Sequence, residues 1–218
     1  MLVTLREVLK DAQKNHYGVW LFNTVNLEMA KGVLAAAEAL KSPVIIGTAE
    51  VLLPYASLEE LAYFLLPMAK KASVPVVLHF DHGLTEPKIM EALRLGFSSI
   101  MYDCSTDSYE NNIGRVAQMV RIANLFGASV EGELGHVGDN VADDDGSIYT
   151  QPAQALDFVN RTGVDALAVA IGTANGAYKE KPKLDIGRLA QIAETVPVPL
   201  VLHGGSGLSD EDFKNCVA

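Results

Sequence analysis

Seven short apolar runs recur along the chain, and longer segments with helical spacing separate them. Each run is almost continuously apolar rather than alternating, which is typical of parallel strands that are covered on both faces. The pattern therefore predicts seven parallel strands. They cover residues 17–24, 42–48, 74–80, 98–104, 128–134, 165–172 and 198–204.

The segments between these runs carry apolar residues at spacings of three and four, the period of an amphipathic helix. Three of them also carry helix-end signals: Asn26 as an N-cap, Ser57 and Glu60 as a capping box, and Gly96 just past a last turn. Helices are predicted over residues 26–40, 57–72, 85–96, 111–127 and 185–196, with a further one over 4–15 before the first strand.

Strand starts lie roughly 25–35 residues apart, about the length of one βαβ step, so the alternation indicates a parallel α/β architecture. The alternatives are a doubly wound sheet and a closed barrel. No G-x-G-x-x-G turn follows the first strand, which weakens the dinucleotide-binding sheet. We therefore predict a (β/α)₈ TIM barrel forming a single domain over residues 1–218. It is expected to be truncated before strand eight, because only a capped helix start (209–218) follows the seventh run and a complete barrel takes about 250 residues.

Composition narrows the class of partner. The chain is 49% hydrophobic and 20% charged, with a formal net charge of −10, which argues against nucleic acid and anionic membrane as main partners. No apolar run reaches the roughly 18 residues of a membrane helix, and the N-terminus lacks the apolar region of a signal peptide. Cys104 and Cys216 fit no paired spacing and are expected to be reduced thiols in a cytoplasmic protein.

Polar residues stand at the carboxyl end of every predicted strand, where barrel enzymes place their active sites. In "LHFDHG", Asp81 and His82 point in opposite directions along an ideal strand, so a turn beginning at His82 would be needed to bring both into one pocket. The alternative is that Asp81 caps the following helix and His82 is a rim histidine. The remaining strand-end residues are Asn23, Thr48, Asp103, Ser105, Glu133, Thr173 and Asn175.

A second such element is "LHGGSG", in which the strand-end His203 precedes a glycine-rich turn whose backbone N–H groups suit an anionic phosphate. A plain turn before a helix is the alternative. Two strand-end histidines with nearby carboxylates are compatible with a catalytic Zn²⁺, which needs about three protein ligands. His16 is expected to be a surface residue at a helix end, and His136 to begin a loop near the site.

Five successive motifs together resemble the class II, zinc-dependent ketose-bisphosphate aldolases, the family of fructose- and tagatose-bisphosphate aldolases. They are "VPVVLHFDHG", "SIMYDCS", "VEGELGHVG", "YTQPAQALDFVNRTGVDALAVAIGTANGAY" and "PLVLHGGSG", and they occur in order over essentially the whole chain. The resemblance implies a (β/α)₈ barrel that reversibly cleaves a ketose 1,6-bisphosphate to dihydroxyacetone phosphate and glyceraldehyde 3-phosphate. It also implies a homodimer or homotetramer.

The resemblance also assigns roles by motif position. Asp81 matches the acid/base that moves the C4 hydroxyl proton, His82 and His203 match zinc ligands, and Glu133 matches a carboxylate close to the metal. One catalytic Zn²⁺ is implied, with a monovalent cation as a further ion. The positions that line the substrate or its phosphate are Asn23, Thr48, Gly176, Gly204, Gly205 and Ser206. No predicted strand interior carries a lysine, which argues against a Schiff-base mechanism.

Two departures from the family pattern bear on activity. Asn175 stands where the family has a third zinc-ligating histidine, and an amide oxygen is a weaker donor than imidazole for Zn²⁺. The family's eighth strand, with its phosphate turn, is also absent. The leading hypothesis is therefore an aldolase. One alternative is a catalytically impaired or silent paralogue that binds a sugar phosphate. Another is an aldolase in which Asn175 was introduced to disable the metal site.

Overall fold

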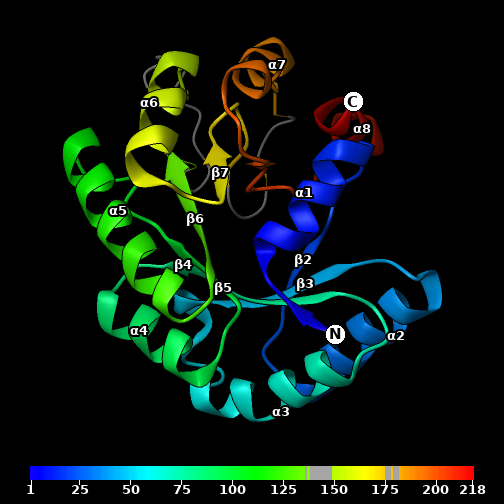
Figure 1. Cartoon of the computed structure of the whole chain (residues 1–218). Helices are drawn as coiled ribbons and strands as arrows, with labels where there is room; N and C mark the ends of the chain where they lie inside the picture. Colours follow the sequence, from blue (N-terminus) through cyan, green and yellow to red (C-terminus); the bar gives the residue numbers. More distant parts are fainter. Residues whose placement is uncertain (136, 138–148, 175–177, 179–181) are drawn as a thin grey trace. The chain divides into compact units, whose positions relative to one another are not determined.

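In the computed structural model, residues 1–135, 137, 149–174, 178 and 182–218 are described. The chain forms two compact units. We call Met1–Asp103 together with Gln118–Glu131 the first unit, and Cys104–Ala117 together with Gly132–Ala218 the second unit. Strands and helices alternate through both, as Figure 1 shows.

All seven predicted strands are present in the predicted order. They are β2 (Leu21–Asn23), β3 (Val44–Ala49), β4 (Val76–Gly83), β5 (Ser99–Tyr102), β6 (Ser129–Leu134), β7 (Ala166–Val169) and β8 (Leu200–Val201). They follow one another across the sheet in sequence order, and the pairs β2–β3, β3–β4, β4–β5 and β7–β8 are parallel. Every residue of β3, β5, β6 and β7 is buried, in agreement with their continuous apolar pattern.

All six predicted helices are present, and the structure adds others. The helices are α1 (Leu5–Asn15), α2 (Leu27–Leu40), α3 (Leu58–Lys71), α4 (Glu86–Leu95), α5 (Tyr109–Leu125), α6 (Pro152–Thr162), α7 (Ile186–Thr195) and α8 (Asp210–Val217), with a 3₁₀ turn η1 (Glu50–Leu52). The predicted ends are confirmed too: the Asn26 side chain accepts a hydrogen bond from the Met29 amide, and Ser57 and Glu60 form a capping box. Gly96 ends α4 in the left-handed conformation.

In the first unit, α2, α3 and α4 lie along one side of the sheet, against β3, β4 and β5 (Figure 1). The core there is formed by large side chains that are almost wholly buried, and Phe80 meets Phe97 edge to face with ring centroids 6.3 Å apart. Its largest members are Tyr102, Phe80, Leu5, Ile46, Leu58, Leu61, Leu65, Leu78, Ile89, Ile100 and Met101.

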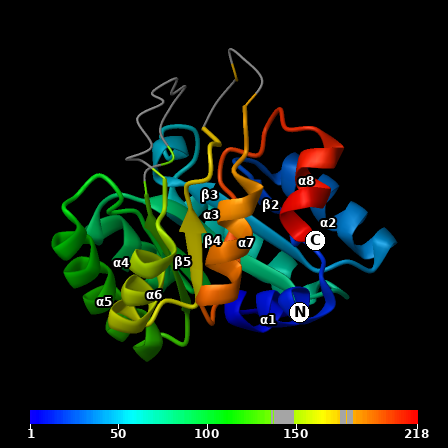
Figure 2. The same ribbon diagram turned by 90° about the horizontal axis from the view of Figure 1, so that it is seen from above.

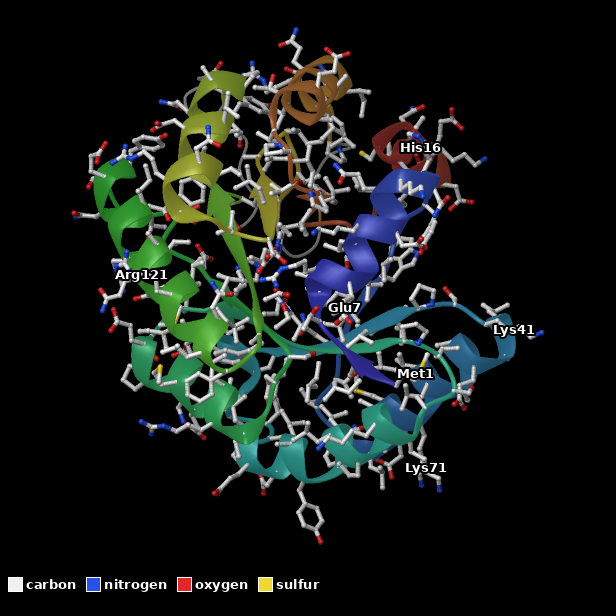
Figure 3. The ribbon with its side chains drawn as sticks, in the orientation of Figure 1. Met1, Glu7, His16, Lys41, Lys71 and Arg121 are labelled. Carbon is white, nitrogen blue, oxygen red and sulfur yellow. The ribbon has the colours of Figure 1, made fainter. Side chains whose placement is uncertain are left out.

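A short strand that the sequence pattern did not predict, β1 (Leu2–Val3), pairs with Val76 and Val77 at the beginning of β4. The N-terminus and α1 therefore lie at the amino ends of the strands of this unit (Figure 2). His16 is the C-cap of α1 and is exposed, as predicted; Figure 3 labels it at the end of the helix. Functional groups of the first unit are thus expected at the opposite, carboxyl ends.

In the second unit, α6 and α7 pack on each other beside β7, and α8 contacts α7. Helix α6 was not among the predicted helices, although Pro152 at its start and Gly163 just past its end are ordinary helix-end signals. Phe158 of α6 is wholly buried, and a Cβ added at Gly132 of β6 would lie 3.0 Å from its ring. Among the described residues, no helix is long and apolar enough to cross a membrane.

Candidate active site

The carboxyl end of β4 contains a bulge that presents Asp81 and His82 in succession. Phe80 pairs with Ile100 and Gly83 with Tyr102, so two residues of β4 stand opposite the single residue Met101 of β5. His82 has a φ of 40°, an uncommon conformation for a residue with a Cβ. The prediction that β4 ends at residue 80 with a turn at His82 is therefore corrected. The strand continues to Gly83, and the bulge re-aims the side chains.

Gly83 lets this bulged end pack closely. A Cβ at this position would lie 2.7 Å from Cγ1 of Ile89 and 2.8 Å from the carbonyl oxygen of Met101. A second anchor is Glu50, whose carboxylate accepts hydrogen bonds from the amides of Leu84 and Thr85 at 2.7 and 3.0 Å. The alternative in which Asp81 caps α4 is wrong, because the N-cap is Thr85 and Glu50 receives the amides that precede the helix.

Asp81 is 5% exposed, and its Oδ2 accepts a hydrogen bond of 2.8 Å from Nδ2 of Asn23 at the end of β2. A buried carboxylate needs such donors, because burial without partners is costly for a charged group. This hydrogen bond from the amide helps to orient the carboxylate. Two of the predicted site residues are thus brought together by the first unit alone.

The imidazole of His82 is oriented by a carboxylate that the sequence did not single out as a site residue. Nδ1 of His82 lies 2.8 Å from Oδ2 of Asp103, and the two side chains are 19% and 13% exposed. With Nδ1 donating to the carboxylate, Nε2 is the nitrogen that can ligate a metal. Metal-binding histidines are commonly held by a carboxylate in this way. The only signal in the sequence was the position of Asp103 at the end of its strand.

Thr48 lies on β3 beside β4, where it pairs with Phe80, and it is wholly buried. Among the described residues, no group forms a hydrogen bond with its Oγ1. Buried hydroxyls normally have a partner. The substrate-lining role of Thr48 stays a prediction.

In the second unit, Glu133 ends β6 and is 1% exposed. Its Oε1 accepts a hydrogen bond of 3.1 Å from the Val137 amide, and its backbone oxygen accepts one of 2.9 Å from Nδ2 of Asn112. Asn112 is 2% exposed and lies in the first turn of α5. Neither contact was predicted. The contact with Asn112 joins residues far apart in the sequence, and the contact with Val137 depends on the turn that follows β6.

The glycine turn after β8 begins with His203, which is half-buried in the second unit. Gly204 has a φ of 71°, and a Cβ there would lie 2.4 Å from the carbonyl oxygen of Ala174. Only glycine allows this approach between the two segments. The hydroxyl of Tyr178, which the sequence did not indicate, accepts a hydrogen bond of 3.0 Å from the Ala174 amide and donates one of 2.6 Å to the Gly204 carbonyl.

Three positions discussed in the sequence, Asn175, Gly176 and His136, lie outside the described residues. The rest of the predicted metal ligands are divided between the units: His82 lies in the first, and Glu133 and His203 lie in the second. Their chemical types, imidazole and carboxylate, are those that bind Zn²⁺ in proteins. The Asp103–His82 pair gives one of these ligands the orientation that a metal site requires, so the residues present fit such an ion.

The fold and these residues define an aldolase-type lyase, and comparisons with known proteins give the same class. The chain is 44% identical over 217 residues to the fructose-bisphosphate aldolase of Thermus caldophilus, an alignment that covers 97% of this chain and 71% of the relative. The crystal structure of the YdjI aldolase from Escherichia coli K12 matches with a TM-score of 0.91 and 40% identity, covering 100% of this chain and 78% of that one. Fructose-bisphosphate aldolase from Campylobacter jejuni matches with a TM-score of 0.85 and 26% identity, covering 99% and 74%.

The family model for "Fructose-bisphosphate aldolase class-II" matches residues 3–218. The chain belongs to the class II fructose-bisphosphate aldolase family. The resemblance seen in the sequence is thereby confirmed, as is the α/β fold class: the described residues contain seven parallel strands alternating with helices, consistent with the predicted truncated TIM barrel.

Proposed function

We propose that this protein reversibly cleaves a ketose 1,6-bisphosphate, fructose or tagatose, to dihydroxyacetone phosphate and glyceraldehyde 3-phosphate. The observation that supports this most is the bulged end of β4. There, consecutive residues provide a carboxylate held by Asn23 and an imidazole held by Asp103. In a chain of this family, an acid/base and a metal ligand are the two groups that the reaction needs.

Asp81 acts as the acid/base in this proposal. It accepts the proton of the C4 hydroxyl as the bond between C3 and C4 breaks, and it returns that proton in the direction of synthesis. Asn23 donates a hydrogen bond of 2.8 Å to one carboxylate oxygen, which orients the carboxylate before the substrate binds. Positioned proton transfer of this kind typically contributes about 10²–10⁴-fold to the rate.

His82, His203 and Glu133, with the side chain at position 175, would hold Zn²⁺. When bound, the ion supplies a Lewis acid that offsets the negative charge of the enediolate left by cleavage. Asp103 keeps the His82 ring in the tautomer that ligates through Nε2. Thr48, Gly176, Gly204, Gly205 and Ser206 are proposed to line the sugar and its phosphate.

Several finer features are proposed with this function: a single cytoplasmic domain over residues 1–218, assembly as a homodimer or homotetramer, and a monovalent cation as a second ion. They are supported by family membership alone. Sedimentation of the purified chain and the dependence of its activity on K⁺ and Na⁺ test the last two.

The alternative function is a catalytically impaired or silent paralogue that binds a sugar phosphate. Asn175 favours it, because replacing one of three strong zinc ligands by an amide should weaken metal binding by orders of magnitude. Against it, Asp81, His82, Glu133 and His203 are all present, and Asp81 and His82 keep ordered partners in the first unit.

The test compares the parent chain with Asn175→His, each alone and combined with Asp81→Asn. Bound zinc is measured by elemental analysis, and triose release from both bisphosphates by a coupled assay. The proposal expects Asn175→His to bind zinc and cleave one of the sugars, and added Asp81→Asn to keep the zinc while losing about 10²-fold or more in kcat.

The outcomes separate the two functions. A zinc-loaded Asn175→His variant that is active beside an inactive parent indicates the impaired paralogue. Activity of the parent itself means that Asn175 or a water completes the site. If Asn175→His on a chain extended to the length of its relatives binds no zinc and cleaves neither sugar, the aldolase proposal is wrong.

A further inference from the structure

Tyr178 joins the segment after β7 to the glycine turn after β8. Its hydroxyl accepts a hydrogen bond of 3.0 Å from the Ala174 amide and donates one of 2.6 Å to the Gly204 carbonyl. One hydroxyl thus satisfies two backbone groups that lie 30 positions apart in sequence numbering, 174 and 204. Partial burial of the ring raises the pKa of the Tyr178 hydroxyl above its ordinary value, so the hydroxyl can donate at neutral pH and above.

The two bridged segments also touch through their backbones. A Cβ on Gly204 would meet the O, C and N atoms of Ala174 at 2.4, 2.7 and 2.9 Å, so no other residue fits there without moving the backbone. Such a close approach buries peptide groups, and buried peptide groups need hydrogen-bond partners. The Tyr178 hydroxyl supplies the partners at this contact.

The ring of Tyr178 supports the far side of the same turn. Gly207 has a φ of 100°, and a Cβ there would lie 3.3 Å from Cδ2 of Tyr178. Among the described residues, none accepts a hydrogen bond from the backbone amides of Gly205, Ser206 or Gly207. Tyr178 therefore holds one end of the turn by a hydrogen bond and lies against the other end, and the amide donors between them are not used by the described residues.

We propose that Tyr178 is a positioning residue that holds this turn in the conformation that receives a phosphate group of the substrate. This inference rests on the proposed function, because it assumes a sugar phosphate as the ligand. Tyr178 is not assigned to the reacting atoms. A fixed turn binds an anion better than a flexible one, since the amide donors are already aligned before binding.

The experiment uses Tyr178→Phe, which removes the hydroxyl and keeps the ring. Its control is Tyr109→Phe in the same unit, whose hydroxyl shares its proton between Asp157 and the Gln154 carbonyl in exposed hydrogen bonds that involve no residue of the turn. Binding of fructose 1,6-bisphosphate and tagatose 1,6-bisphosphate is measured by calorimetry with Zn²⁺ present, with phosphate-free fructose as the reference. Steady-state kinetics follow where the parent is active.

The inference expects the Tyr178→Phe variant to bind the bisphosphate about ten-fold more weakly, the size of effect that losing one to two net hydrogen bonds produces. KM should rise by the same factor with kcat within about two-fold, because the turn binds ground and transition states alike. Tyr109→Phe should lower the melting temperature without changing the dissociation constant.

A second measurement needs no variant. Bisphosphate binding to the parent should slow amide hydrogen exchange at Ala174 as well as in Gly205–Gly207, because Tyr178 couples them. Protection of the turn without Ala174, or equal affinities for Tyr178→Phe and parent, would overturn this inference alone. If the parent itself binds neither bisphosphate, the proposed function and this inference both fail.

Discussion

At the scale of single residues, the site depends on positions where local backbone geometry is unusual. His82 takes a positive φ inside a bulge, and Gly83 follows with no room for a side chain. Residues in sparsely populated conformations persist only when their surroundings hold them, and they concentrate at functional sites. In the first unit the surroundings are identifiable. Asp103 holds the His82 ring, and the Glu50 carboxylate accepts hydrogen bonds from the amides of Leu84 and Thr85.

Gly83→Ala tests how closely this end is packed. The added Cβ would lie 2.7 Å from Ile89 and 2.8 Å from the Met101 backbone, so we expect a loss of about 1–3 kcal/mol in unfolding free energy. Zinc affinity should fall as well, because His82 is the preceding residue. Urea denaturation and zinc titration measure the two effects.

The matched control is Gly32→Ala in α2, where an added Cβ meets nothing within 4 Å. Inside a helix this change is expected to stabilise by about 0.5–1 kcal/mol. Equal effects of the two substitutions would show that the contacts at Gly83 do not constrain the bulge.

At the scale of elements, helix ends are held by groups from outside the helix as well as by their own caps. In helix α4 the Thr85 side chain makes no cap hydrogen bond. Instead, Glu50, from the turn that follows β3, accepts hydrogen bonds from the amide and the hydroxyl of Thr85. Helix α7 has a cap of its own, Asp185, which accepts from the Arg188 amide at 2.9 Å and from Nε of Arg188 at 3.0 Å. An Asp directly before a helix, such as Asp185, is a cap that a sequence can indicate. The contact from Glu50, 35 residues away from Thr85, is not.

Asp185 gives a pH-dependent prediction. The Arg188 amide, and then the Arg188 side chain, hold the pKa of this carboxyl below its ordinary 3.8. Its contribution is therefore present above the unfolded-state pKa and is lost as the pH falls through the lower folded-state pKa. Asp185→Ala should cost about 1 kcal/mol at pH 7, and the difference from the parent should shrink below about pH 3.

Urea unfolding at pH 7 and at acid pH measures this difference. Glu194→Ala, near the other end of α7, removes an exposed carboxylate that is not expected to stabilise the helix. A penalty for Asp185→Ala that stays constant with pH would show that the carboxylate charge plays no part in the cap.

At the scale of the whole molecule, family membership and strand composition favour metal over Schiff-base chemistry. None of the eight described strands contains a lysine, so no strand offers an amine to form a Schiff base with a ketose. The imidazole and carboxylate side chains at the strand ends are instead of the chemical types that bind metal ions.

We therefore expect chelation with EDTA to abolish the activity of the zinc-loaded protein, or of its Asn175→His variant, and added Zn²⁺ to restore it. Borohydride in the presence of substrate should cause no loss of activity and no mass increase by mass spectrometry. A covalent adduct trapped on any lysine would contradict this class of mechanism.

Much of this protein follows from sequence by physical necessity. Continuous apolar runs such as residues 42–48 must be buried on both faces, which fixes parallel strands, and the intervening helices with their caps follow from spacing. The strand-end positions of Asp81, His82 and Glu133 follow in turn. Helix α6 was also within reach, because Pro152 and Gly163 mark its ends.

Tertiary structure decided how the site residues are held, because the contacts that hold them join residues far apart in the sequence and leave no local pattern. The β4 bulge, which replaces the predicted turn, is a feature of the pairing between β4 and β5, where two residues stand opposite one. Asp103 on His82, Asn112 on Glu133 and Tyr178 on Gly204 join positions 21, 21 and 26 residues apart. The sequence thus determines which groups stand at the strand ends, and the tertiary hydrogen bonds determine how each one is held.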